Sequence, residues 1–554
     1  MKKLIAIFLT VMLISLSLPV ATAVNDYEYL PTIYIRGNGE ALYYPDGTRL
    51  VASFEDISFG SEDSGIDKDV IVETVVNILK PFVIEGMLFD KWDNYGRAIY
   101  EELKPLFPDA GLDENGNPVK GTGISASQQD LKNRLPKSKW EYNNGYDYPF
   151  IYDWRLSPYD YVDELHAFIE QIMSTTGKKQ VNIWARCLGG GLLSAYLEKY
   201  GDRGHIKNVM FAQVLSNETT IISKAFSGQI EFDAKLVERY AGQLDYLGQT
   251  GEGQGFIFGD VLYEIVFKTM DFFNQISVTD KVLDEVEELY EKLYKALVPA
   301  LCHAVGLATQ VNYWTTVAEE DMDDALDLIF GKEGSELRTK YSGLIAKIQM
   351  YRENVSSDID GFYDGLKNNG IYFGFMANYG FMNAPLTKDA DLISDALVSL
   401  EHAAYGATAA KVGAALPEDY IEARIAEGKG KYISPDKAVD LSSAYAPDTT
   451  WVVKNAHHDN FDVPFGKILR AFLNGTNETV ESIGAPRYQI YDFNTKSVLP
   501  MTQENCADLS FMTLPVEKPT TETRLVSFMR FFTMLIEFIT MLFNGELDFG
   551  SLFG

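Results

Sequence analysis

Cysteine and basic residues are both scarce in this chain. Only three cysteines, Cys187, Cys302 and Cys506, occur among 554 residues. Their odd number leaves at least one thiol unpaired, although Cys302 and Cys506 could form a disulfide. So few cysteines in so long a chain exclude a fold that depends on disulfides. Lys and Arg number 48 against 79 Asp and Glu, and the resulting net charge of −31 argues against nucleic acid and anionic membrane surfaces as electrostatic partners.

The N-terminus has the features of a secretory signal peptide over residues 1–23. Lys2 and Lys3 precede an apolar run from residue 4 to residue 18, and Ala21-Thr22-Ala23 forms a small-residue cleavage site. We therefore expect a secreted, extracellular protein, with attachment to the cell surface or a membrane as the alternative.

The order of apolar runs predicts an α/β fold with a mostly parallel central sheet. Strand-like runs occupy residues 32–35, 149–152, 181–187, 209–214, 371–376 and 450–453. Segments with helical periodicity follow several of these runs, and alternation of strands with helices is typical of a parallel sheet flanked by helices.

The chain divides into five predicted parts. The core is expected in two halves, residues 24–216 and 370–502. Residues 217–369 have helical periodicity and are too long for a loop, so they predict a helical cap. A linker and an amphipathic C-terminal helix are expected over residues 503–554. Within that helix, residues 525–543 are apolar apart from one polar stripe, which predicts contact with a lipid interface or with the protein itself. Arg530 and Glu537 make membrane crossing costly.

The stretch from Val181 to Leu193 has the pattern of a nucleophile elbow. An apolar strand runs into Cys187, and a Gly-rich helix start follows it. Ala185 and Gly189 stand two residues before and after the cysteine, where a strained strand-to-helix turn requires small side chains. The alternative is a buried structural cysteine ahead of a Gly-rich helix.

Other candidate residues follow strands in the order expected of a catalytic triad. Gly37 and Asn38 follow the first strand, where backbone N–H groups can serve an oxyanion together with Leu188, although an ordinary Gly-Asn turn is the alternative. Asp395 comes after the strand at 371–376, and two histidines come after the last strand. In such a triad Cys187 attacks an acyl carbonyl, a histidine moves the proton and Asp395 orients the imidazole ring.

The segment from Pro149 to Leu197 resembles the lecithin:cholesterol acyltransferase-like lipases of the α/β-hydrolase superfamily. The likeness lies in Asp153-Trp154-Arg155 after a strand, about 30 residues before the elbow. It implies an α/β-hydrolase fold and a supporting role for these three residues beside the active site. It also favours His458 over His457, because an apolar residue follows His458 three positions later.

Two departures from that family bear on activity. Ala185-Arg186-Cys187 stands where the family has Gly-His-Ser or a similar sequence, and Arg36-Gly37 stands where it has the oxyanion histidine-glycine. In the acid motif, alanine also replaces the glycine after Asp395. We expect a lipase- or esterase-like hydrolase, or an acyltransferase, that acts on esters with apolar acyl chains through an acyl-thioester, with no metal or cofactor. The alternative is a catalytically degenerate protein of the same fold that binds lipid or another surface.

Overall fold

A computed structural model describes residues 30–37, 41–53, 74, 77–78, 81–125, 128, 147–215, 218–229, 236, 239–240, 242–243, 280–385, 387–458 and 465–506. The predicted signal peptide, the C-terminal helix over 525–543 and Asn38 lie outside these residues.

The centre of the molecule is an eight-stranded sheet in the order β12-β11-β10-β7-β6-β5-β1-β4. All neighbouring strands are parallel except β11 and β12, which are antiparallel. A mostly parallel sheet is therefore confirmed. Its strands are β1 (Thr32–Ile35), β4 (Asp147–Phe150), β5 (Val181–Cys187), β6 (Ile206–Val214), β7 (Tyr372–Tyr379), β10 (Thr450–Lys454), β11 (Tyr488–Asp492) and β12 (Ser497–Pro500).

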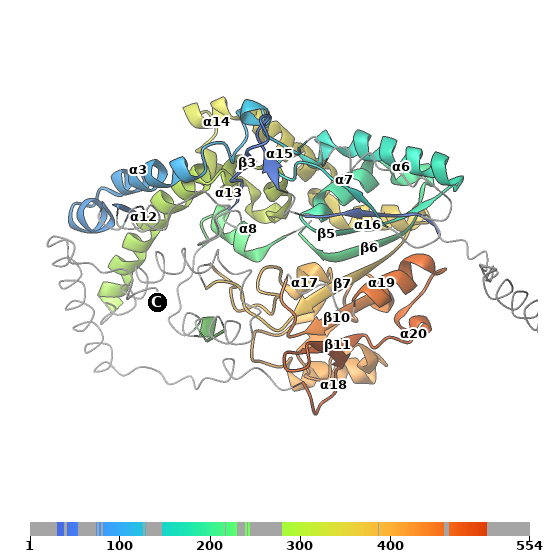
Figure 1. The fold of residues 1–554 in the computed structure, drawn as a ribbon. Coiled ribbons are helices and arrows are strands. Elements are labelled where there is room, and N and C mark those ends of the chain that lie inside the picture. Colours follow the sequence, from blue (N-terminus) through green and yellow to red (C-terminus); the bar gives the residue numbers. More distant parts are fainter. Residues whose placement is uncertain are drawn as a thin grey trace, which may run out of the picture.

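Helices cover both faces of this sheet (Figure 1). Alternate residues of β5 point to opposite faces, as a strand requires. Ile183 and Ala185 belong to the larger core cluster with residues of α6 (Val162–Thr176) and α7 (Gly189–Tyr200). Trp184 packs in a separate cluster with α19 (Phe465–Asn474) on the other face. Strands buried on both sides explain why their sequences are almost continuously apolar.

The described residues between β6 and β7 are rich in helices and contain no strand. Trp314, Phe330 and Ile348 belong to a hydrophobic cluster that is separate from the two clusters beside the sheet. The helices of this segment are α8 (Thr220–Phe226), α12 (Asp280–Ala304), α13 (Met322–Phe330), α14 (Glu336–Lys340), α15 (Ser342–Asn354) and α16 (Ile359–Asn368). Helix α3 (Trp92–Leu103), from an earlier part of the chain, lies beside α12 (Figure 1).

The remaining elements are short. They are the paired strands β2 (Leu42–Tyr43) and β3 (Arg49–Leu50), the paired strands β8 (Thr408–Ala409) and β9 (Val439–Asp440), and helices α17 (Leu400–Ala403), α18 (Glu418–Ala426) and α20 (Val480–Ile483). No helix in the described ranges is both long and apolar enough to cross a membrane.

Two features differ from the expectations. Cys302 and Cys506 do not pair, because all three cysteines are free thiols. Cys302 is buried in α12, whereas Cys506 is partly exposed after the last strand. Strands β11 and β12 were not predicted. They extend the sheet beyond β10, and β12 is an exposed edge strand whose sequence carries little apolar pattern.

Candidate active site

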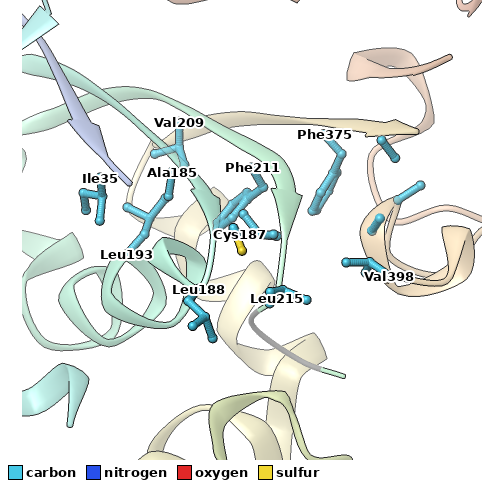
Figure 2. Packing of buried hydrophobic residues seen from close by; sticks show 14 of the residues in the cluster. Ile35, Ala185, Cys187, Leu188, Leu193, Val209, Phe211, Leu215, Phe375 and Val398 are labelled. Carbon is cyan, nitrogen blue, oxygen red and sulfur yellow. The ribbon is translucent and has the colours of Figure 1, made fainter. Parts of the chain in front are cut away.

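Cys187 occupies the strained turn between β5 and α7. The strand ends at this residue, Leu188 caps the helix, and α7 begins at Gly189. The backbone of Cys187 has a φ of 55°, a left-handed conformation that costs a residue with a side chain on the order of 1–3 kcal/mol. The predicted elbow geometry is therefore present in the backbone. Figure 2 shows Cys187 at the end of its strand among buried apolar side chains, including Leu188 and Leu215.

Two glycines pack directly against this turn. A Cβ atom on Gly37 would lie 2.5 Å from the Cβ of Cys187, 2.9 Å from the backbone nitrogen of Leu188 and 3.0 Å from the sulfur. A Cβ atom on Gly189 would lie 2.5 Å from the carbonyl oxygen of Ile35. Cβ atoms in proteins do not approach other heavy atoms so closely, so neither position can carry a side chain without a shift of the backbone. The end of β1 thus lies against the elbow, and the backbone of Gly37 lies close to that of Leu188.

Asp395 is brought to the end of β7 by a short backbone pairing. Phe381, just beyond β7, exchanges backbone hydrogen bonds of 2.9 and 2.7 Å with Ser394. The Asp395 side chain is fully buried, and its Oδ1 accepts hydrogen bonds from the backbone nitrogens of Leu397 (3.0 Å) and Val398 (2.7 Å). These bonds fix the carboxylate and leave Oδ2 directed at the imidazole of His458.

His458 lies between Asp395 and Cys187. Its Nδ1 is 2.8 Å from Asp395 Oδ2, and its backbone nitrogen donates to the Asp395 carbonyl oxygen at 2.9 Å. The other ring nitrogen, Nε2, is buried. The Cys187 side chain acts on the ring both electrostatically and by hydrogen bonding.

The pKa of His458 is raised well above its usual value. Burial by itself would lower it, because a charged ring loses hydration in the interior. Coulombic interactions with Asp395 and Cys187, together with hydrogen bonding to both side chains, outweigh this effect. The raised pKa favours the protonated imidazole, which suits a group that must later protonate a leaving group.

Arg186 connects the elbow to the histidine loop. Its Nη2 donates to the carbonyl oxygen of His458 at 2.5 Å, and its Nε donates to Oε1 of Gln213 at 3.2 Å. Gln213 is fully buried near the end of β6 and has a φ of 50°. The residue before the cysteine thus fixes the backbone of the histidine, a role that the sequence pattern did not indicate.

His457 takes no part in this arrangement. Its carbonyl oxygen accepts a hydrogen bond of 2.9 Å from Asn378 Nδ2, and its ring lies edge-on to Phe381 with the centroids 6.2 Å apart. Of the two histidine candidates, His458 is the one that contacts Asp395.

Asp153 and Arg155 form a buried, bidentate ion pair behind the elbow. Arg155 Nη2 and Nε lie 2.6 and 2.9 Å from the two carboxylate oxygens of Asp153. The guanidinium also donates to the carbonyl oxygens of Asp109 (3.2 Å) and Ala110 (3.3 Å). Trp154 is buried, and its ring is edge-on to that of Tyr313. These residues join the end of β4 to neighbouring segments.

Asn312 links that ion pair to the elbow. This fully buried residue lies in the 3₁₀ helix Val311–Thr316, far from the elbow in sequence. Its backbone nitrogen donates to the Arg155 carbonyl oxygen and its Nδ2 donates to the Leu188 carbonyl oxygen, each at 3.4 Å. No motif marks Asn312, because its position depends on how the helical segment packs.

No protein-family model, no curated protein and no solved structure matches this chain. Within the described part of the chain, no group of three or more His, Cys, Asp or Glu side chains is arranged to hold a metal ion. The chemistry of the site is therefore inferred from its geometry, which brings Cys187, His458 and Asp395 together.

Proposed function

We propose that the protein is an exported hydrolase or acyltransferase that acts on esters with apolar acyl chains through Cys187, His458 and Asp395. The observation that carries the proposal is the buried Asp395–His458 pair next to a cysteine on a strained strand-to-helix turn. An acid that orients an imidazole beside a nucleophile is the arrangement shared by unrelated acyl-transfer enzymes.

The position of these residues on the sheet supports the same assignment. Cys187, Asp395 and His458 follow β5, β7 and β10, and Gly37 follows β1. All four strands are parallel, so the residues beyond their carboxyl ends gather at one edge of the sheet. Nucleophile, acid and histidine come in the chain order of α/β-hydrolases. This order supports the resemblance to the lecithin:cholesterol acyltransferase-like lipases, with the helical segment between β6 and β7 as the cap.

The chemical steps follow from the roles of the three groups. The Cys187 sulfur, as thiolate, bonds to the acyl carbon, and the carbonyl π electrons move to oxygen. The backbone N–H groups of Leu188 and Gly37 would stabilise that oxyanion. When the C=O bond re-forms, the bond to the alcohol breaks, and His458 gives its Nε2 proton to the departing oxygen. Water or a second alcohol then loses a proton to His458, attacks the thioester and releases the thiolate and the acyl product.

The surroundings of the sulfur favour an apolar acyl group. Leu188, Leu215 and Val398 belong to the same buried cluster as Cys187 (Figure 2). Burial of an acyl chain against such side chains removes apolar surface from water and so stabilises binding. Exclusion of water from the site also strengthens the electrostatic contacts of the oxyanion.

Thiol alkylation provides the test. Iodoacetamide should abolish the hydrolysis of p-nitrophenyl butyrate, and Cys187→Ala should abolish it without any reagent. Cys302→Ala is the matched control, because burial raises the pKa of the Cys302 thiol to about 12 and leaves it protonated and unreactive. If wild-type protein turned over no acyl ester and Cys187 resisted iodoacetamide, the proposal would be rejected in favour of a non-catalytic binding protein.

A further inference from the structure

Tyr152 is a buried polar residue that neither the ion pair nor the triad accounts for. Its side chain is 2% exposed, and its hydroxyl makes no hydrogen bond within ordinary distance and angle limits among the described residues; its hydrogen-bonding neighbour is the Asn312 side chain. A buried hydroxyl whose hydrogen bonding is incomplete costs free energy on folding, so its retention at such a position calls for an explanation.

The register of the sheet puts Tyr152 level with the elbow. Phe150 of β4 pairs with Ile35 of β1, and Ile35 pairs with Ala185 of β5. Two residues further along in sequence stand Tyr152 and Gly37, just beyond the ends of β4 and β1, and Cys187, the last residue of β5. Tyr152 and Cys187 both belong to the large buried cluster beside the sheet, and an electrostatic interaction joins the two side chains.

Gly37 leaves the space between the two side chains open. It lies between Tyr152 and Cys187 in this row and has no side chain, and a Cβ atom there would already collide with the cysteine. A tyrosine hydroxyl can therefore approach the sulfur from the adjoining strand end without an intervening side chain.

The electrostatics agree with this placement. Burial raises the pKa of Tyr152, and the coulombic interaction with Cys187 raises it further, so the phenol keeps its proton. The amide of Asn312 acts in the opposite direction, as an N–H donor near a phenol oxygen does. A donor facing the oxygen leaves the hydroxyl proton available for an acceptor on the substrate.

We propose that the Tyr152 hydroxyl is a third oxyanion donor, which gives a hydrogen bond to the acyl carbonyl oxygen as Cys187 adds to the carbonyl carbon. This inference rests on the proposed acyl-transfer function and adds a side-chain donor to the backbone N–H groups of Leu188 and Gly37. The hydroxyl keeps its proton throughout, so the step needs no further reactant.

Tyr152→Phe is the decisive variant, because it removes only the hydroxyl. Loss of one oxyanion donor costs on the order of 10²-fold in kcat. We expect this loss with p-nitrophenyl butyrate and an equal weakening of an alkyl trifluoromethyl ketone, which forms a tetrahedral adduct on the sulfur. The rate of Cys187 alkylation by iodoacetamide should not change, because alkylation forms no oxyanion.

Tyr351→Phe is the matched control. Tyr351 is equally buried and interacts with Ser194 and Tyr363, so its variant should retain the wild-type kcat.

The possible outcomes separate the two proposals. Wild-type kcat and ketone affinity in Tyr152→Phe would overturn the role of the hydroxyl and leave the acyl-transfer function standing. A lowered unfolding midpoint with unchanged kcat would mean a purely structural hydroxyl. A wild-type protein without turnover would overturn both proposals. If Tyr152→Phe does not fold, 3-fluorotyrosine at position 152 can replace it, because this residue keeps the ring and makes the hydroxyl more acidic. A changed kcat would support the proposal, and an unchanged kcat would reject it.

Discussion

Replacing Gly37 with alanine tests how closely β1 approaches the elbow. The new Cβ would lie 2.5 Å from Cys187 Cβ and 2.9 Å from the Leu188 nitrogen. Carbon atoms pack best about 3.5–4.0 Å apart, so one backbone segment has to withdraw by about 1 Å. The φ of Gly37 is not positive, and alanine can therefore adopt its backbone conformation without strain. Any effect then comes from the collision alone.

That displacement should cost both stability and rate. Overpacking a buried contact lowers the free energy of unfolding by about 1–3 kcal/mol. A shift of about 1 Å in a positioned group can cost about 10²-fold in rate. Alanine keeps the backbone N–H of residue 37, so the loss of rate would reflect the donor's position and not its removal.

The assay combines urea unfolding with the rate of p-nitrophenol release from an acyl ester. Gly365→Ala, in helix α16, is the control, because a Cβ atom there meets no atom within 4 Å. That variant should gain about 1 kcal/mol from helix propensity and keep its rate. If Gly37→Ala showed wild-type stability and an unchanged rate of acylation, the close approach and the oxyanion geometry built on it would be refuted.

Three further predictions concern the acid, its neighbour and the ion pair behind the site. Ala396→Gly should raise the free energy of unfolding by about 0.5–1 kcal/mol, because the φ of 77° favours glycine; an equal or lower urea midpoint would contradict this. Arg155→Met should lower the free energy of unfolding by about 3–5 kcal/mol, because it leaves a buried carboxylate unpaired. Lys199→Met breaks an exposed ion pair and should lower it by about 0–1 kcal/mol. Equal losses in the two variants would count against burial as the cause. Asp395→Asn should lower kcat by about 10²–10⁴-fold without preventing folding. The same variant should also lose the stability that the Asp395–His458 interaction contributes. Because the pKa of His458 is raised in the folded protein, that contribution is complete below about pH 6.5 and disappears as pH rises through the folded pKa. Urea unfolding of wild-type and Asp395→Asn protein between about pH 5 and about pH 10 should show that the difference in their free energies of unfolding shrinks as pH rises. A difference that grew with pH would contradict the assignment.

The parts of the site that sequence could predict are those that local chemistry constrains. The elbow can be predicted because a strained turn needs small residues around Cys187. The structure shows Gly189 in close contact with the backbone of Ile35 at this turn. Asp395 and His458 were readable because parallel strands deliver the residues that follow them to one edge of the sheet. The order of strands and helices indicated that sheet for the same reason.

Other features depend on tertiary packing and carry no local signal. Asn312 contacts the Leu188 carbonyl oxygen from a 3₁₀ helix 124 positions away in sequence. Tyr152 lies within the Pro149–Leu197 segment, yet only the pairing of β4, β1 and β5 and its electrostatic interaction with Cys187 connect it to the elbow. Strand β12 pairs antiparallel at the sheet edge, where an exposed strand needs no alternating apolar pattern.

The central claim is that Cys187 becomes acylated, and the mass of the protein after exposure to an activated acyl ester tests it most directly. We expect a mass increase of one acyl group, mapped to the peptide that contains Cys187. The adduct should be absent in Cys187→Ala and slow to form in His458→Ala. No adduct on wild-type protein, or an adduct mapped to another residue, would contradict it.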